Sequence, residues 1–387
     1  MLRRSVLVVL AGLLVILAAF LAVRPSSLWY WTPLTERSIL KLYTLDTDPR
    51  RYDVIILGAS IAEFAFYPDL IEAQLKARLG LADPEARRRD YAVYNASIQA
   101  AFLPTYLEVL RNIVGDSQEP TAVMLAVSPR DFNGSSYRVQ RQVRFLARSP
   151  ADLWLVFVKA GNTAQRWSVI HAFTHGLEVL VQAPLYPLYR DDVDYFRQGH
   201  GRILLDHYPV LRSVMERDVN SDITPEFFER LRQNGVTEVR EHQVNDFAIN
   251  GLIDAWTRAI IAEARNKNVR LAVVLMPATE WFDRNAFGDN LRLTREYIAR
   301  VCAETGTPFY DLRDPRFRPE DGNYFDGCDH LALAGAAPLS KAVTDEIIIP
   351  LLAGPAATNA PPPPEGKPIP GRAGFQVAPA DGAPAVP

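Results

Sequence analysis

Short apolar segments alternate with longer amphipathic segments along most of this 387-residue chain. The short segments are rich in Val, Ile and Leu, as expected of strands covered on both faces, and the longer ones repeat apolar residues at helical spacing. We expect strands at residues 52–57, 91–95, 122–127, 269–276 and 308–312, and helices at residues 61–79, 104–114, 247–267, 291–305 and 334–348. This alternation predicts an α/β fold, a three-layer α/β/α sandwich around a mostly parallel five-stranded sheet.

The alternation is interrupted between residues 135 and 245, inside a predicted α/β domain that spans residues 51–352. Aromatic-rich segments take its place, and we expect helices there at residues 151–159, 164–182 and 224–233. Because this helical insertion separates the third strand from the fourth, we expect it to emerge at an edge of the sheet. It either covers a site as a lid or packs on the core as a helical subdomain.

Residues 1–24 predict a transmembrane helix that anchors the chain. An apolar run at residues 6–23 is long enough to cross a bilayer, and the arginines before it favour a cytoplasmic N-terminus, which exports everything after Arg24. A cleaved signal peptide is the alternative, because small residues lie near the end of the run. The length of the run and the aromatic residues at 29–31 favour an uncleaved, single-pass anchor.

The segments on either side of the predicted α/β domain are expected to lie outside its core. Residues 25–50 are expected to be a connector between the anchor and the domain. Residues 353–387 are rich in Pro and Ala, cannot form a packed core, and are expected to be a disordered tail.

Composition excludes some classes of function. The net charge is −3 and the 42 basic residues are spread without a long basic stripe, so nucleic acid is not an expected partner. His171 and His175 are four residues apart on a predicted helix, but no third ligand lies nearby, and we expect neither a metal nor another cofactor. Cys302 and Cys328 are either bridged or unpaired.

A serine follows the first predicted strand directly, in the block Gly58-Ala59-Ser60. A serine where a buried strand turns into a helix has its hydroxyl at the carboxyl edge of the sheet. There, the partly positive helix N-terminus stabilises a developing anion. The pattern therefore predicts a nucleophile, and the alternative is that Ser60 caps the following helix.

A histidine near the end of the domain supplies the second half of a candidate site, in the block Asp326-Gly327-Cys328-Asp329-His330. An imidazole with a nearby carboxylate provides a general base and its orienting partner, which a serine needs in order to act as a nucleophile near neutral pH. The alternative is a loop histidine that is hydrogen-bonded to its acidic neighbours.

Together these blocks resemble those of the SGNH (GDSL-like) hydrolase superfamily, in particular a membrane-anchored bacterial branch that includes proteins of alginate O-acetylation and lipoteichoic-acid D-alanyl transfer. The likeness covers residues 50–135 and 245–350 and implies an SGNH/flavodoxin-like sheet. Residues 58–60 match the nucleophile block and residues 325–331 the late Asp-x-x-His block. Residues 127–132 are similar to a Pro-Arg-Asp-Phe turn of that branch.

The acid of the late block departs from the family pattern, which has it three residues before the histidine, where this chain has Gly327. We favour Asp326 as the orienting acid because an immediate neighbour usually points away from the imidazole that it precedes. Asp329 is the alternative. Asp131, after the third strand, is either a site residue or the cap of the next turn.

The oxyanion donors depart from the pattern as well. The matching block at residues 94–100 contains no glycine, so the backbone amide of a small residue, Ser97 or Ala100, is expected to take that part. Arg130 replaces the family's Asn, which makes its guanidinium a third candidate donor.

The resemblance implies an exported serine O-acyltransferase or esterase that acts on a cell-envelope or secreted polysaccharide through an acyl-Ser60 intermediate. It also implies a position in a bacterial inner membrane, with the catalytic domain in the periplasm, beside a multispanning acyl-transporting membrane protein. The alternative is a catalytically inactive scaffold or polysaccharide-binding protein that keeps the fold.

Overall fold

The computed structural model describes residues 36–82, 90–136, 158–159, 200 and 225–354. The five expected strands form one parallel sheet in the order β2-β1-β3-β4-β5. Their bounds are β1 (Val54–Leu57), β2 (Val93–Asn95), β3 (Ala122–Val127), β4 (Arg270–Leu275) and β5 (Phe309–Asp311). The prediction of an α/β fold is confirmed. In this strand order the chain changes direction between β1 and β3, and ligands of such sheets bind at the carboxyl ends beside that point.

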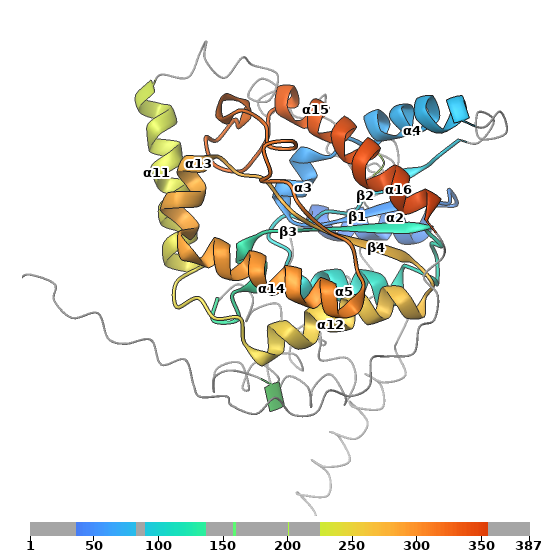
Figure 1. The fold of residues 1–387 in the computed structure, drawn as a ribbon, viewed down its shortest axis with the longest axis horizontal. Helices are drawn as coiled ribbons and strands as arrows, with labels where there is room; N and C mark the ends of the chain where they lie inside the picture. Colours follow the sequence, from blue (N-terminus) through green and yellow to red (C-terminus); the bar gives the residue numbers. More distant parts are fainter. Residues whose placement is uncertain (1–35, 83–89, 137–157, 160–199, 201–224, 355–387) are drawn as a thin grey trace, which may run out of the picture.

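Helices cover both faces of the sheet, which gives three layers (Figure 1). One face carries α2 (Glu36–Thr47), α5 (Leu103–Asn112), α12 (Gly251–Asn266) and α14 (Asp289–Thr305). The other carries α3 (Ser60–Ala65), α4 (Pro68–Ala82), α15 (Leu333–Val343), the π-helical turn η9 (Thr344–Ile348) and α16 (Ile349–Ala353).

The central strand β1 shows why its sequence is apolar throughout. Every residue of β1 is buried, and successive side chains enter opposite cores. Ile55 and Leu57 join the core on the α5 side, whereas Val54 and Ile56 join the core under α3 and α15. A strand covered on both faces has no polar side to show, so its run of β-branched residues is what burial requires.

Three helical segments differ from expectation. The single helix expected at residues 61–79 is two helices, α3 and α4, because Pro68 cannot continue a helix and starts a new one. The helix expected at 334–348 runs through α15, η9 and α16 to Ala353. Residues 36–47, expected to be part of a connector, form the helix α2.

The helix α11 (Pro225–His242) lies at the end of the insertion expected at residues 135–245 and extends beyond the helix expected at residues 224–233. It packs through Val236 and Val239 on a small core shared with Phe282 of α13 (Glu280–Phe282) and with Cys328. This contact brings the end of the insertion next to the block that contains His330.

Several expectations fall outside the described residues: the helices at 151–159 and 164–182, except for 158–159, the anchor at 1–24, and the tail beyond residue 354. Within the part of the chain that the structure describes, none of the helices combines the length and apolar character needed to span a bilayer.

Candidate active site

Ser60 lies at the carboxyl end of β1, where Gly58 permits a tight turn into α3. A Cβ added at Gly58 would lie 2.6 Å from Ala62 Cβ and 3.0 Å from the Ala126 carbonyl oxygen, so the close approach of β3 and α3 requires glycine there. The N-cap of α3 is Ala59, and Ser60 is the first helical residue. The alternative interpretation of Ser60 as the helix cap is therefore wrong.

His330 lies in a loop that closes on itself after β5. Tyr324 and Leu331 form an antiparallel bridge, and the Phe325 amide donates to the His330 carbonyl oxygen at 3.0 Å. Gly327 has φ of +67°, and a Cβ there would lie 2.4 Å from Arg232 Cγ. Only glycine fits this left-handed position against α11, which explains why the acid is not three residues before His330.

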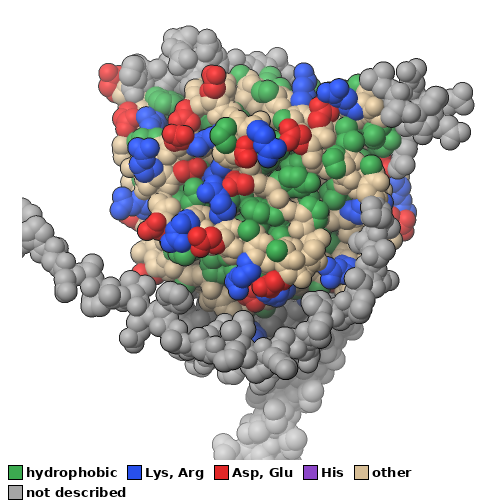
Figure 2. All heavy atoms as spheres, in the orientation of Figure 1, with side chains coloured by type: hydrophobic (Ala, Val, Ile, Leu, Met, Phe, Trp, Pro, Cys, Tyr) green, Lys and Arg blue, Asp and Glu red, His purple; other side chains and the backbone are tan. Residues whose placement is uncertain are grey.

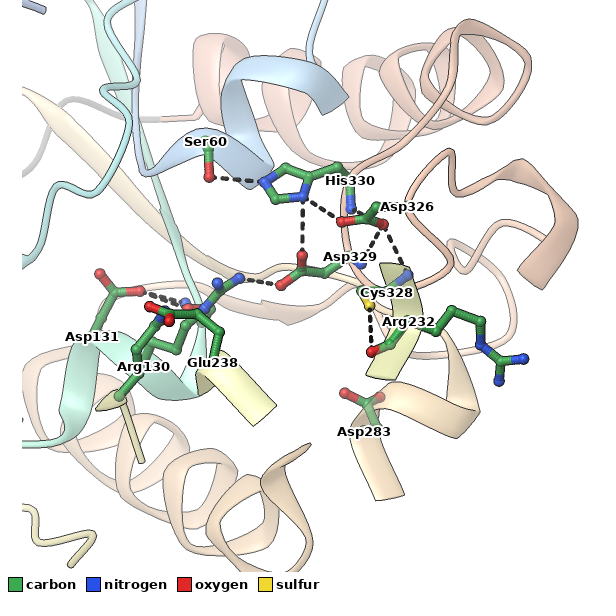
Figure 3. Close-up of polar contacts among 12 residues, drawn as sticks. Ser60, Arg130, Asp131, Arg232, Glu238, Asp283, Asp326, Cys328, Asp329 and His330 are labelled. Atoms are coloured by element: carbon green, nitrogen blue, oxygen red, sulfur yellow. Dashed lines mark hydrogen bonds and ion pairs between the residues drawn. The ribbon is translucent and has the colours of Figure 1, made fainter. Parts of the chain in front are cut away.

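The loop brings its histidine to the serine across 270 residues of sequence (Figure 3). Ser60 Oγ lies 2.9 Å from His330 Nε2, and His330 Nδ1 lies 2.6 Å from Asp326 Oδ2. These contacts have the order hydroxyl, imidazole, carboxylate. Each distance is within hydrogen-bonding reach, which is the geometry required for a base to take a proton from an activated nucleophile.

Asp326 is fixed by the backbone of its own loop. Its Oδ1 accepts hydrogen bonds from the amides of Cys328, Asp329 and His330, at 2.8, 3.2 and 3.2 Å. Burial raises the pKa of Asp326, but the charge and hydrogen bond of His330 together with these amides outweigh it, and the net pKa is lowered. The carboxylate is thus held ionised with one oxygen free for the imidazole.

Asp329 also faces the imidazole, contrary to the expectation that an immediate neighbour points away. Its Oδ1 lies 3.3 Å from His330 Nδ1, farther than Asp326. Its Oδ2 pairs with the guanidinium of Arg130, in the 3-10 turn η3 (Pro129–Phe132) that follows β3. Burial raises the pKa of Asp329, and Arg130 opposes that rise.

The two carboxylates make His330 a stronger base. Burial alone would lower the pKa of this imidazole, but Asp326 and Asp329 outweigh it, and the pKa is raised above its ordinary 6.5. Aromatic rings flank the imidazole: Phe325 stacks on it with centroids 5.8 Å apart, and Phe64 of α3 meets it edge-on at 5.4 Å. These rings leave the Nε2 edge directed at Ser60.

The expected oxyanion donors differ in their surroundings. The Ser97 amide donates to Asn95 Oδ1 at 3.0 Å and is therefore engaged, and Ala100 is exposed with φ of +58°. Arg130 pairs with Asp329. The amides of Ser60 and Ile61, in the first turn of α3, have no hydrogen-bond acceptor among the described residues.

Asp131 caps the turn after β3. Its Oδ2 accepts from the Ser128 amide at 2.7 Å and from the Ser128 hydroxyl at 3.0 Å, and its Oδ1 accepts from the Tyr106 hydroxyl. Burial raises the pKa of Asp131 to about 6. Of the two interpretations left open by the sequence, the structure favours the cap.

A buried ion pair between α2 and α3, the helix that begins with Ser60, was not predicted from the sequence. Lys41 of α2 is 1% exposed and its Nζ donates to Glu63 Oε1 at 2.8 Å and to the Ser97 carbonyl oxygen at 2.5 Å. Glu63 is on α3, one turn after Ser60. The apolar spacing of Leu42 and Leu45 would have indicated a helix here, but nothing in the sequence marks Lys41 as buried.

The remaining candidates lie elsewhere or outside the described residues. Cys302 and Cys328 are both buried free thiols. His200 contacts Arg50 and Glu72, and His242 is at the exposed end of α11. His171 and His175 fall outside the described residues.

Asp326, Asp329 and His330 are close enough to hold a metal ion, with ligand atoms within 4.8 Å of one another. Their lone pairs, however, are already used: Asp326 accepts three amides and faces His330, and Asp329 is paired with Arg130. The arrangement fits hydrogen bonding to an imidazole better than it fits metal coordination.

Two hollows of about 350 and 540 Å³ lie at the amino ends of β4 and β5 and beside the loop before β3, and neither is lined by Ser60 or His330. Basic and acidic side chains are mixed over the face drawn in Figure 2, with no continuous basic area among the described residues there. Neither the hollows nor the surface charges indicate a second functional site.

Comparison with known proteins does not identify a family for this chain. No family model matches the chain, and no curated protein matches it significantly.

Proposed function

We propose that this chain is an SGNH-type serine acyltransferase or esterase that works through an acyl-Ser60 intermediate. One observation carries the proposal: Ser60 Oγ, His330 and Asp326 form a continuous hydrogen-bonded series, 2.9 and 2.6 Å long at its two links, at the carboxyl edge of a parallel sheet. That edge, beside the point where the chain changes direction, is where such sheets bind ligands.

In the first half of the reaction, Ser60 Oγ attacks the acyl carbonyl carbon and its proton passes to His330 Nε2. The tetrahedral intermediate collapses, its bond to the leaving alcohol or thiol breaks, and that group takes the proton from His330. The acyl group is now an ester of Ser60. Asp326 stabilises the imidazolium that forms and keeps Nε2 directed at the hydroxyl.

In the second half, water or a sugar hydroxyl attacks the acyl-Ser60 carbonyl, and His330 takes its proton. Ser60 Oγ then leaves and recovers a proton from His330. The amides of Ser60 and Ile61 supply oxyanion donors, because helix geometry leaves them without acceptors. Transfer to a sugar hydroxyl gives an acylated polysaccharide, and transfer to water gives hydrolysis.

The substrate and location rest on the resemblance and on residues 6–23. An uncleaved anchor would hold the domain outside the inner membrane of a bacterium, where a multispanning membrane protein can deliver acyl groups and an envelope polysaccharide can receive them. A reporter that is active only in the periplasm, fused after residue 354, tests the topology. It should be active, and an inactive reporter would contradict the proposed export.

A fluorophosphonate probe tests the nucleophile. Full-length protein in detergent should be labelled at Ser60 and should release p-nitrophenol from its acetate ester, while Ser60→Ala should do neither. Ser340→Ala is the matched control, because Ser340 is buried and bonded to the Ala65 carbonyl oxygen. Labelling that survives in Ser60→Ala would remove Ser60 from the reaction.

One observation favours the inactive scaffold as a second candidate: the Ser97 amide and Arg130, both expected to stabilise an oxyanion, are engaged with Asn95 and Asp329. The two candidates separate in cells. Loss of polymer acylation in both Ser60→Ala and His330→Ala at unchanged protein level supports the enzyme, and unchanged acylation supports the scaffold.

A further inference from the structure

Arg130 and His330 contact opposite ends of one carboxylate (Figure 3). The guanidinium of Arg130 pairs with Asp329 Oδ2, while Asp329 Oδ1 lies 3.3 Å from His330 Nδ1. Arg130 belongs to the turn after β3 and Asp329 to the loop after β5, so the pair joins two elements on either side of β4.

Asp329 lies in a position that disfavours the ionised form of a carboxyl group. The residue is 2% exposed, and a second carboxylate, Asp326, faces the same imidazole nitrogen. Burial and a neighbouring negative charge both favour the protonated form of a carboxyl group. Arg130 is the cation that opposes them at hydrogen-bonding contact, and its side chain is itself only 14% exposed.

We propose that Arg130 is a positioning residue of this site, which keeps Asp329 ionised and aimed at His330 Nδ1 so that Asp329 serves as a second, electrostatic partner of the base. Asp326 makes the shorter hydrogen bond and orients the ring. Asp329 adds negative charge beside the imidazolium that forms when Ser60 loses its proton. The inference rests on the proposed role of His330 as the base.

Within the part of the chain that the structure describes, the other groups that contact the His330 ring are a hydroxyl and two aromatic rings, none of them charged. The helix α3 presents the Ser60 hydroxyl and the Phe64 ring, and the loop itself presents Phe325. Arg232 of α11 stacks its guanidinium over Trp281 at 3.9 Å and points away from the imidazole. Among the described residues, the charges that act on His330 are therefore those of Asp326, Asp329 and Arg130, and the same three contribute to the shift of its pKa.

A double-mutant cycle separates this role from that of an oxyanion donor. We would measure kcat/KM for p-nitrophenyl acetate with Arg130→Gln, Asp329→Asn and the double variant, all in the full-length chain. If Arg130 acts through Asp329, Arg130→Gln should lower kcat/KM about tenfold when Asp329 is present. In the Asp329→Asn background it should lower kcat/KM by less than about twofold. If Arg130 instead donates to the oxyanion, Arg130→Gln should lower kcat/KM by about 10²–10³ in both backgrounds. That result would overturn the proposal.

The pKa of His330, followed by NMR of the labelled imidazole, gives a readout that needs no turnover. Asp329→Asn should lower this pKa, because one of two carboxylates that stabilise the imidazolium is gone, and an unchanged value would contradict the inference. If wild type shows no turnover or labelling, the proposed function fails while this titration still decides the role of Asp329. Should Arg130→Gln not fold, the neutral variant Arg130→Met in the same two backgrounds replaces it, with the loss again expected only where Asp329 is present.

Discussion

The buried pair of Lys41 and Glu63 makes a quantitative prediction about stability. Lys41 is 1% exposed and Glu63 is 6% exposed, and their charged atoms lie 2.8 Å apart. Lys41→Met would leave the Glu63 carboxylate buried without a cation. Removing one partner of such a pair typically costs about 3–5 kcal/mol, so we expect a loss of that size in the free energy of unfolding.

The double variant Lys41→Met/Glu63→Leu should recover most of this loss. It removes both charges together, and its remaining cost is the hydrogen bond from Lys41 Nζ to the Ser97 carbonyl oxygen, about 1 kcal/mol. The single variant should therefore be less stable than the double variant by about 2–4 kcal/mol. Glu63 is one turn from Ser60, so the single variant should also reduce probe labelling of the serine.

Urea unfolding followed by tryptophan fluorescence is a suitable assay, since Trp256 is fully buried in the core that α2 helps to form. Arg292→Ala is the control, because it breaks an exposed pair with Glu296 at 2.9 Å and should leave the unfolding midpoint unchanged. The reasoning fails if Lys41→Met costs less than about 1 kcal/mol, or if the double variant is no more stable than the single one.

Three further predictions concern the site and its supports. Asp326→Asn should lower kcat about 10⁴-fold, because the imidazole loses the acceptor that fixes its tautomer. Burst kinetics with an activated ester measure this loss. A larger loss in Asp329→Asn would make Asp329 the orienting acid. The acidic limb of kcat/KM should lie above pH 6.5, since the base must be neutral and the pKa of His330 is raised, and a limb below pH 6 would count against His330 as the base. Because burial raises the pKa of Asp131 from 3.8 to about 6, its contribution to stability should fall by ~3 kcal/mol as the pH rises from about 4 to above 6. Urea midpoints should show that fall in wild type but not in Asp131→Asn, and parallel pH curves would refute it.

The central strands β1 and β3 were predictable from the sequence because burial on both faces leaves only apolar residues in them. The alternation of helices and strands then predicts a parallel arrangement. The break between α3 and α4 was missed although Pro68 marks it, since apolar residues keep helical spacing across the break. The helix α2 was missed because residues 36–47 were assigned to a connector on the basis of their position.

Sequence reasoning brought Ser60, His330 and Asp326 together as a hypothesis, because strand ends in a parallel sheet share one edge. It could not foresee the pairing of Arg130 with Asp329, which joins residues 199 positions apart through side-chain rotamers. It also could not foresee that Gly327 has a left-handed backbone and packs against Arg232. This packing requires glycine at position 327, where the family pattern has its acid, and the acid of this chain is Asp326.

The long separation between the serine and the histidine has a consequence for biosynthesis. The acid and the base are made within five residues of each other near the end of the domain, whereas the nucleophile is made 270 residues earlier. A nascent chain therefore carries a serine without its base until residues 326–330 have been made, with α15, η9 and α16 still to follow. Fragments that stop before residue 326 should therefore carry an ordinary, unreactive serine hydroxyl at position 60.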